Sequence, residues 1–283
     1  MSPAARTRTA RAPSARRRRA PAQPRRPTPA GPRHYLSLKD AATAWLPVFE
    51  DLARGMEQTV GERAIMCLSG DAGVGKTFAL DAVLAAKPRP ARRARLVRLV
   101  PRPAPTPLSL RSDLAAALNL EARPKDPGAF DAALREVLAA RDHLLVVDEA
   151  QRLDSVCFEY LRYLFDDPYA RLALVLVVGE RGQAVLRRQK MLASRTAVSL
   201  MVPHLTLADV AEVIPCFHPL WRGAEADALT RLDVRWCHGN FRRWAQATHH
   251  ALRLLRQAPA LRGAPHPLLE DVLDATFPPR EEP

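Results

Sequence analysis

The chain has 283 residues, of which 47% are hydrophobic and 26% charged, a composition ordinary for a globular protein. The longest apolar run is too short to cross a bilayer and no apolar leader is visible, so we expect neither a membrane protein nor a secreted one. The four cysteines contain no CxxC pair, which argues against a zinc or disulfide framework and favours a cytoplasmic location; they are Cys67, Cys157, Cys216 and Cys237.

The net charge of +13 is concentrated at the N-terminus. Residues 1–33 contain ten Arg, seven Pro and no acidic residue, with almost no large apolar side chain. Such a segment cannot bury enough surface to fold, so we predict a disordered basic tail. The tail is either a solvated terminus or an arm that neutralises phosphates, while its Pro density disfavours a third interpretation, an organelle transit peptide.

Strand and helix patterns alternate over the first two thirds of the chain. Short apolar segments predict five strands, at 64–68, 95–100, 143–147, 172–178 and 198–202. Helical periodicity predicts helices at 77–84, 110–118, 129–139 and 156–165. At the N-terminal side, Ser37 and Asp40 resemble a capping box that opens a helical region, with Pro47 kinking it or starting a second helix. This alternation predicts an α/β fold, a parallel five-stranded sheet flanked by helices.

Only helical patterns follow Pro203, at 207–214, 224–232 and 241–255. We therefore predict four parts: a basic tail over 1–33, an α/β core over 34–203, a small all-helical lid over 204–262 and a C-terminal tail over 263–283.

A glycine-rich segment between the first strand and its helix fits the phosphate-loop pattern GxxxxGK[ST] in full. The glycines let several N–H groups converge on a phosphate at a helix N-terminus. Lys76 can reach the β- and γ-phosphates, and the Thr77 hydroxyl can ligate Mg²⁺. The pattern predicts a site for ATP and Mg²⁺ made by Gly70, Asp71, Ala72, Gly73, Val74, Gly75, Lys76, Thr77 and Phe78.

Two carboxylates, Asp148 and Glu149, end the apolar strand over 143–147. In phosphate-loop enzymes this is the Walker B arrangement. Asp148 then holds Mg²⁺ beside Thr77, and Glu149 acts as the general base that polarises the attacking water.

With both motifs placed, the chain resembles the AAA+ ATPases over about residues 36–257. Three motifs are similar to those of TnsC, TniB and MuB, ATPases that regulate DNA transposition. They are Asp-Glu-Ala-Gln-Arg-Leu at 148–153, Val-Val-Gly at 177–179 and Gly-Asn-Phe-Arg-Arg at 239–243. The resemblance implies a P-loop AAA+ fold with an α/β nucleotide-binding core and an ATP-hydrolysing, Mg²⁺-dependent enzyme. It also implies a homo-oligomer, as a ring or filament, that binds double-stranded DNA largely without sequence specificity. A transposase is the implied protein partner.

The same resemblance implies further site residues. The sensor 1 position falls on Glu180, although an acid near a phosphate is electrostatically unfavourable. Either Arg242 or Arg243 fits sensor 2, an arginine of the lid that reaches the nucleotide. Arg195 precedes the fifth strand, where an arginine finger acts on the neighbouring subunit's site; the competing candidates are Arg187 and Arg188.

A second basic stretch lies inside the core, with no acidic residue between Asp81 and Asp113. Because nothing in this stretch of sequence neutralises the charge, Arg92, Arg93 and Arg98 are our predicted DNA contacts. The alternative is a set of exposed arginines around a strand edge.

Other functions remain open at this stage. A secretion-type ATPase shares the DEAQ motif but usually also contains a membrane span or a peptidoglycan-binding domain. A signalling switch usually also contains effector domains. A non-hydrolysing scaffold is disfavoured by the intact Glu149. A helicase loader is the nearest functional neighbour, and fold alone does not distinguish it.

Overall fold

The structure is a computed structural model that describes residues 34–86, 94–121, 125–179, 192 and 194–257. The strands are β1 (Ile65–Ser69), β2 (Arg95–Leu99), β3 (His143–Val147), β4 (Leu172–Val177) and β5 (Thr196–Met201). The helices of the α/β part are η1 (Tyr35–Ser37), α1 (Pro47–Glu62), α2 (Lys76–Ala86), α3 (Pro107–Leu118), α4 (Pro127–Ala140), η2 (Ala150–Arg152) and α5 (Ser155–Phe165). After β5 come α8 (Leu207–Phe217), η3 (Pro219–Trp221), α9 (Ala226–Leu232), η4 (Asp233–Cys237) and α10 (Phe241–Gln257).

The five strands form one sheet in the order β2-β3-β4-β1-β5, and every neighbouring pair is parallel. The prediction of a parallel five-stranded sheet is therefore confirmed. β1 and β3, which carry the two motifs, both neighbour β4, so the ends of three strands meet at one edge of the sheet. In parallel sheets this carboxyl edge is where ligands bind.

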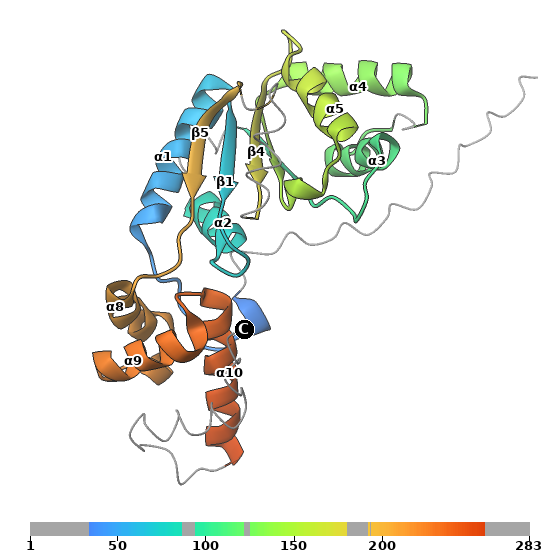
Figure 1. Ribbon diagram of the computed structural model, residues 1–283. Coiled ribbons are helices and arrows are strands. Elements are labelled where there is room, and N and C mark those ends of the chain that lie inside the picture. The colour runs from blue at the N-terminus through green and yellow to red at the C-terminus, as the bar shows by residue number, and fades with distance from the viewer. Residues whose placement is uncertain (1–33, 87–93, 122–124, 180–191, 193, 258–283) are drawn as a thin grey trace, which may run out of the picture. The chain divides into compact units, whose positions relative to one another are not determined.

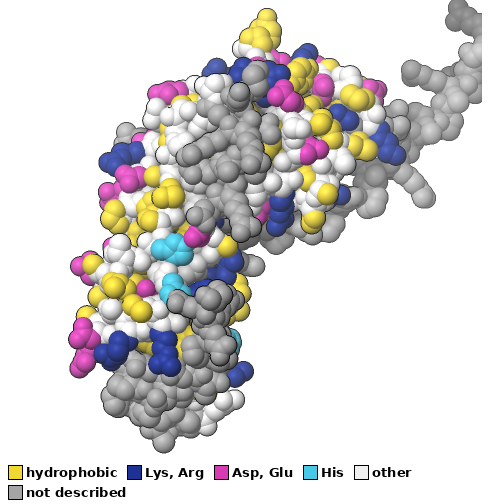
Figure 2. Space-filling view, viewed as in Figure 1, with side chains coloured by type: hydrophobic (Ala, Val, Ile, Leu, Met, Phe, Trp, Pro, Cys, Tyr) yellow, Lys and Arg dark blue, Asp and Glu magenta, His cyan; other side chains and the backbone are white. Residues whose placement is uncertain are grey.

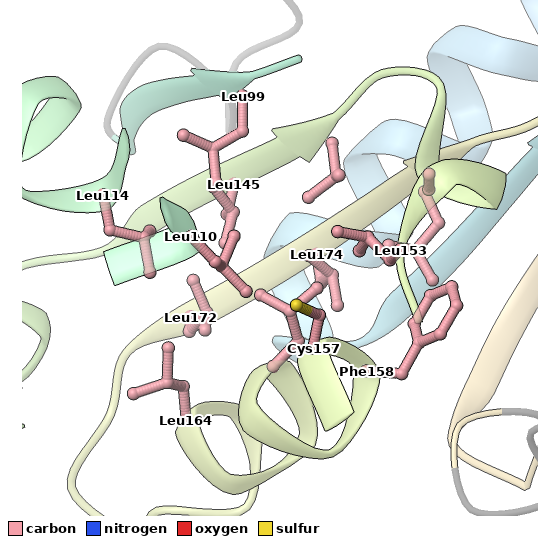
Figure 3. Close-up of a cluster of buried hydrophobic side chains, with 14 of the residues drawn as sticks. Leu99, Leu110, Leu114, Leu145, Leu153, Cys157, Phe158, Leu164, Leu172 and Leu174 are labelled. Atoms are coloured by element: carbon pink, nitrogen blue, oxygen red, sulfur yellow. The ribbon is translucent and has the colours of Figure 1, made fainter. Parts of the chain in front are cut away.

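Helices cover both faces of the sheet, and alternate side chains of each strand point to opposite faces. On β1, Ile65 and Cys67 pack with α3, α4 and α5, whereas Met66 and Leu68 pack with α1 and α2. Figure 1 shows these two helical groups on opposite sides of the strands, and Figure 3 shows the leucine-rich cluster between the sheet and α5. The strands are thus fixed from both sides, which holds their ends rigidly.

Several helices begin where capping residues predict it. Thr106 and Thr206 each form a capping box, with Ser109 and Asp209 respectively. The predicted opening at Ser37 is wrong, because Ser37 and Asp40 both have positive φ and lie in a short 3₁₀ turn and the bend after it. The first α-helix starts at Pro47, whose fixed φ suits the first helical position and which therefore does not kink a helix.

All elements described after β5 are helical, as predicted. Their core is an edge-to-face pair of buried tryptophans, Trp221 and Trp244, whose ring centroids lie 5.4 Å apart. Both indole N–H groups are satisfied, because Trp221 donates to Thr248 Oγ1 at 2.9 Å and Trp244 donates to Asp233 Oδ1 at 2.8 Å.

The remaining parts of the predicted division lie outside the described residues: the tail over 1–33, residues 258–262 and the segment over 263–283. Within the described part of the chain, no helix is both long and apolar enough to cross a membrane.

Candidate functional site

The loop between β1 and α2 turns on three glycines with positive φ. Gly70, Gly73 and Gly75 have φ values of 149°, 90° and 99°. A Cβ at Gly70 would lie 2.5 Å from the Val202 carbonyl oxygen, and one at Gly73 would lie 2.4 Å from Asn240 Oδ1. Both positions therefore require glycine for two reasons, the backbone conformation and the close approach. The loop leads straight into α2, so its N–H groups lie at a helix N-terminus.

Lys76, the first residue of α2, folds its side chain back over this loop. Its Nζ donates to the carbonyl oxygens of Gly70 at 2.8 Å and Asp71 at 2.7 Å. Burial lowers the pKa of the Lys76 ammonium, and the nearby carboxylates of Glu149 and Asp148 oppose that shift. The cation is thus held beside the loop at the place where phosphate oxygens can replace the carbonyls.

Thr77 and Asp148 meet across the carboxyl edge of the sheet. Thr77 Oγ1 donates to Asp148 Oδ2 at 2.8 Å, which joins the start of α2 to the end of β3. A hydroxyl and a carboxylate are hard oxygen donors of the type that Mg²⁺ prefers. The two side chains that the sequence assigned to one metal ion are therefore close enough to share it.

Glu149 follows Asp148 in a left-handed conformation, with φ of 57°. Its backbone N–H donates to Asp148 Oδ1 at 2.9 Å, and its Oε2 accepts from Gln151 Nε2 at 2.7 Å. Gln151 was not among the predicted site residues, although its position in the Asp-Glu-Ala-Gln motif was the available signal.

A cavity of about 420 Å³ is lined by two sets of side chains that differ in chemistry, which we call its charged end and its aromatic end. Lys76, Thr77 and Glu149 line one end. The other is largely aromatic and is lined by His34, Tyr35, Phe49, Phe78, Phe217 and Phe241. This volume lies in the range of small-molecule and cofactor sites. Phosphates match the charged end, and a flat base matches the aromatic end.

His34 contributes to the aromatic end, which the sequence did not reveal. Its ring lies 4.7 Å from the Phe78 ring and 5.7 Å from the Phe217 ring, measured between centroids. Burial lowers the pKa of His34, and the nearby His218 lowers it further. The imidazole therefore stays neutral near pH 7 and behaves as one more aromatic wall.

The C-terminal helical region contacts the phosphate loop through Asn240. Asn240 Nδ2 donates to the Ala72 carbonyl at 2.8 Å, while its Oδ1 accepts from the N–H groups of Arg242 at 3.1 Å and Arg243 at 3.3 Å. The Arg242 N–H also donates to the Gly73 carbonyl at 3.0 Å. One buried amide thus caps α10 and ties that helix to the loop.

The two sensor 2 candidates point to different places. Arg242 lines the cavity, and its guanidinium lies 5.5 Å from the centroid of the Tyr35 ring. Arg243 donates from Nη1 to the Trp236 carbonyl at 3.3 Å and lines a separate cavity beside Asp71.

Arg195 makes a two-pronged contact with Asp166 on its own chain. Its Nε and Nη2 donate to the two carboxylate oxygens at 2.6 and 2.9 Å, and Arg162 donates to the same carboxylate at 2.9 Å. Burial raises the pKa of Asp166, but the hydrogen bonds from the two arginines outweigh this and leave it below its ordinary value. The other finger candidates, Arg187 and Arg188, and the sensor 1 position Glu180 lie outside the described residues.

The internal basic stretch is partly neutralised, contrary to the prediction. Arg98 pairs with Asp81, and Arg102 pairs with Asp113 at 2.8 Å. These are the two acids that bound the stretch in sequence, and the fold brings them back to it. Arg92 and Arg93 lie outside the described residues. On the face drawn in Figure 2, Lys and Arg side chains are interspersed with Asp and Glu.

Comparison with known proteins identifies the type of fold. Residues 58–186 match the family model described as AAA domain. The chain has the AAA+ fold. It is similar to the Aeropyrum pernix ORC2 protein in ADPNP–ADP complexes, with a TM-score of 0.59 and 15% identity over 75% of this chain and 64% of that chain. It is also similar to Drosophila ORC bound to DNA, with a TM-score of 0.66 and 14% identity over 86% of this chain and 63% of that chain.

A third similar structure is the Thermotoga maritima RuvB Holliday junction branch migration motor, with a TM-score of 0.55 and 18% identity over 81% of this chain and 68% of that chain. This chain spans slightly less than two thirds of the length of the two ORC chains. Among curated protein sequences, none matches it significantly. The resemblance to AAA+ ATPases is therefore supported, whereas the narrower resemblance to TnsC and TniB stays a hypothesis.

Proposed function

We propose that this protein is a Mg²⁺-dependent ATPase that hydrolyses ATP to ADP and phosphate. The observation that carries the proposal is the Thr77–Asp148 hydrogen bond of 2.8 Å, because it brings the two motifs together at one edge of the sheet. Lys76 and Glu149 line the adjoining cavity. A phosphate loop that merely turned the chain would not need this set of charged groups.

In this proposal each side chain has one task. The N–H groups of residues 70–77 and the Lys76 ammonium neutralise the phosphates. Thr77 and Asp148 hold Mg²⁺, which neutralises developing charge when bound. Glu149 accepts the proton of the attacking water, while the aromatic end of the cavity holds the base. Arg242, on the cavity wall, serves as sensor 2.

The test is phosphate release measured at a range of Mg²⁺ concentrations with the full chain. We expect ATP turnover that requires Mg²⁺ and is lost when Asp148 is changed to Asn. Asp154→Asn is a matched control, because Asp154 caps α5 outside the cavity. Turnover that persists in Asp148→Asn would contradict the proposal.

We further propose that the chain forms a homo-oligomer in which Arg195 acts on the site of the neighbouring subunit. Arg195 then has to leave Asp166, so the ion pair that holds it in cis competes with assembly. Arg195→Ala should keep ATP binding and lose the stimulation of hydrolysis that assembly provides. Mixing it with Lys76→Ala protein should restore activity, because each variant supplies what the other lacks.

Arg162→Ala is the matched control for this experiment, since it removes a partner of the same Asp166 but leaves Arg195 in place. Failure of the mixture to regain activity, with assembly intact, would assign the finger to another arginine.

We propose that the partner of this oligomer is double-stranded DNA, bound largely without sequence preference. The support is the net charge of +13 and the similarity to the structure of Drosophila ORC bound to DNA. Changing Arg92, Arg93 and Arg98 together to Ala should reduce the slope of log affinity against log salt by about 0.9 for each lost phosphate contact. Unchanged affinity and slope would move the DNA surface elsewhere.

The most specific form of the proposal is a regulator of transposition that recruits or activates a transposase. Its support is the pair of motifs at 148–153 and 239–243, which resemble those of the transposition regulators. A helicase-loader-like function is the second candidate, supported by the similarity to ORC structures. The DNA-bound, ATP-loaded oligomer should stimulate strand transfer by a transposase encoded beside it; stimulation of helicase loading instead would select the second candidate.

A further inference from the structure

Gln151 connects the end of β3 to the end of β4. It is the second residue of η2, the short 3₁₀ turn that begins directly after Glu149. Its Nε2 donates to Glu149 Oε2 at 2.7 Å, and its Oε1 accepts from the backbone N–H of Gly179 at 3.2 Å. Gly179 lies two residues beyond β4 and is the last residue described before the predicted sensor 1 position.

The orientation of this amide is fixed by its partners. A backbone N–H can only donate and an ionised carboxylate can only accept, so the amide oxygen must face Gly179 and the amide nitrogen must face Glu149. Turning the amide over would set donor against donor and acceptor against acceptor. The contact to Glu149 is also charge-assisted, which makes it the stronger of the two.

Glu149 lines the cavity of about 420 Å³ while this contact is formed. The nearby Arg152 contributes little to holding the Glu149 carboxylate in this position. Its guanidinium lies 3.8 Å from Glu149 Oε2 and donates instead to the Pro101 carbonyl at 3.2 Å. The Gln151 amide is thus the short contact that restrains the carboxylate, and it occupies one of the two oxygens. Neither the Gln151 nor the Arg152 contact uses the other oxygen, Oε1.

We propose that Gln151 is a positioning residue for ATP hydrolysis, acting through Glu149. It holds the carboxylate toward the cavity and anchors it to the backbone at the end of β4. This inference rests on the proposed ATPase function. It assigns a role to a residue that is not among those lining the cavity, and it explains why a neutral amide stands at this point of the turn.

The test compares Gln151→Met with the wild-type chain. Met has a similar length but can neither donate to Glu149 nor accept from Gly179. We expect kcat to fall about tenfold to a hundredfold, because a misplaced base costs rate rather than binding. ATP affinity should stay within about twofold of wild type, since the phosphate contacts do not change. In a Glu149→Gln background, Gln151→Met should cause no further loss.

Gln151→Glu separates the two hydrogen bonds. It keeps an acceptor for the Gly179 N–H but places a second carboxylate against Glu149. If the contact with Glu149 matters, kcat should fall at least as far as in Gln151→Met. Gln58→Met is the matched control, because Gln58 is an exposed residue of α1 that hydrogen-bonds Glu62 in the same manner.

Four results would overturn the inference: unchanged or increased kcat in Gln151→Met, full activity in Gln151→Glu, an equal loss in the Glu149→Gln background, or a parallel loss of ATP affinity. The last two would mean a general structural role, which the melting temperature of each variant reports separately. A wild-type chain that hydrolyses no ATP would contradict the proposed function instead, so the two failures are distinguishable.

Discussion

The two ends of the cavity are built in different ways. The charged end comes from two neighbouring pieces of the α/β core: the loop and first turn of α2, and the residues directly after β3. The aromatic end combines residues before α1 with residues of α1, α2, α8 and α10. Phe78 and Phe217, which both contact the His34 ring, are an example of this long-range assembly.

This difference predicts different effects of mutations at the two ends of the cavity. The Thr77–Asp148 contact at the charged end links the start of α2 to the end of β3, and Asn240 of the C-terminal helical region also contacts the phosphate loop. The aromatic end is complete only when residues 34–44 and α10 are docked. We therefore expect changes at the charged end to affect phosphate binding and hydrolysis, and changes at the aromatic end to affect binding of the base and the stability of the fold.

The largest effect should come from Lys76→Ala, at the charged end. Its ammonium is the cation that the structure holds against the phosphate loop, and an Ala leaves the phosphates without it. We expect ATP affinity, measured by calorimetry, to fall by at least about a hundredfold, or about 2.7 kcal/mol. Lys125→Ala, at an exposed position before α4, is the control. Near-normal affinity in Lys76→Ala would remove the basis for the phosphate site.

Glu149→Gln should separate chemistry from binding at the same end. The amide keeps the size of the side chain but cannot accept a proton from water. We expect turnover to fall by about 10²- to 10⁴-fold with ATP affinity nearly unchanged. Rapid-quench measurement of a single turnover tests this directly, with the exposed Glu57→Gln as control. Unchanged hydrolysis would transfer the role of base to another group.

Asn240 tests the connection between the two ends. Asn240→Ala removes both the cap of α10 and the bond to Ala72, so it should lower the melting temperature and weaken nucleotide binding. Asn240→Asp keeps an acceptor for the N–H groups of Arg242 and Arg243 but loses the donor to Ala72.

For Asn240→Asp we expect a smaller loss of stability than for Asn240→Ala, because the cap of α10 is kept, and weaker nucleotide binding by up to about fivefold, since one hydrogen bond is worth about 1 kcal/mol. If Asn240→Asp binds nucleotide as well as wild type, the contact between α10 and the phosphate loop contributes nothing to affinity.

The charged end could be predicted from sequence because its determinants are local. Gly70 to Thr77 are consecutive, and Asp148 and Glu149 end a recognisable buried strand, so motif and strand patterns alone indicated that they would meet. The sheet was predictable for the same reason, since each strand is a short apolar run. The bounds of these elements moved by only a residue or two in most cases.

The errors and omissions have non-local causes. Arg98 looked unneutralised because its partner Asp81 lies in α2, and only the packing of that helix beside β2 brings the two together. Ser37 and Asp40 fit a capping pattern, but the segment instead packs against α8, where the Ala42 N–H donates to the Phe217 carbonyl. Asn240 and Gln151 stand within recognised motifs, yet each also contacts a residue far away in the chain, which is Ala72 for Asn240 and Gly179 for Gln151.

The smallest effect should come from His34, at the aromatic end. Burial and the nearby His218 lower its pKa, so the folded chain resists protonation while the unfolded chain takes up a proton near pH 6.5. Stability is therefore fully present above that pH and is lost as the pH falls below it, by at most about 1.4 kcal/mol per pH unit for this one group.

His34→Phe keeps a ring against Phe78 and removes the titration. We expect the melting temperature of this variant to fall less than that of wild type between pH 7.5 and pH 5.5, with nucleotide affinity at pH 7.5 changed by less than about threefold. An identical pH response in the two proteins would mean that His34 does not titrate in this range, whereas a large loss of affinity at pH 7.5 would mean that the imidazole contacts the base by hydrogen bonding and is more than an aromatic wall.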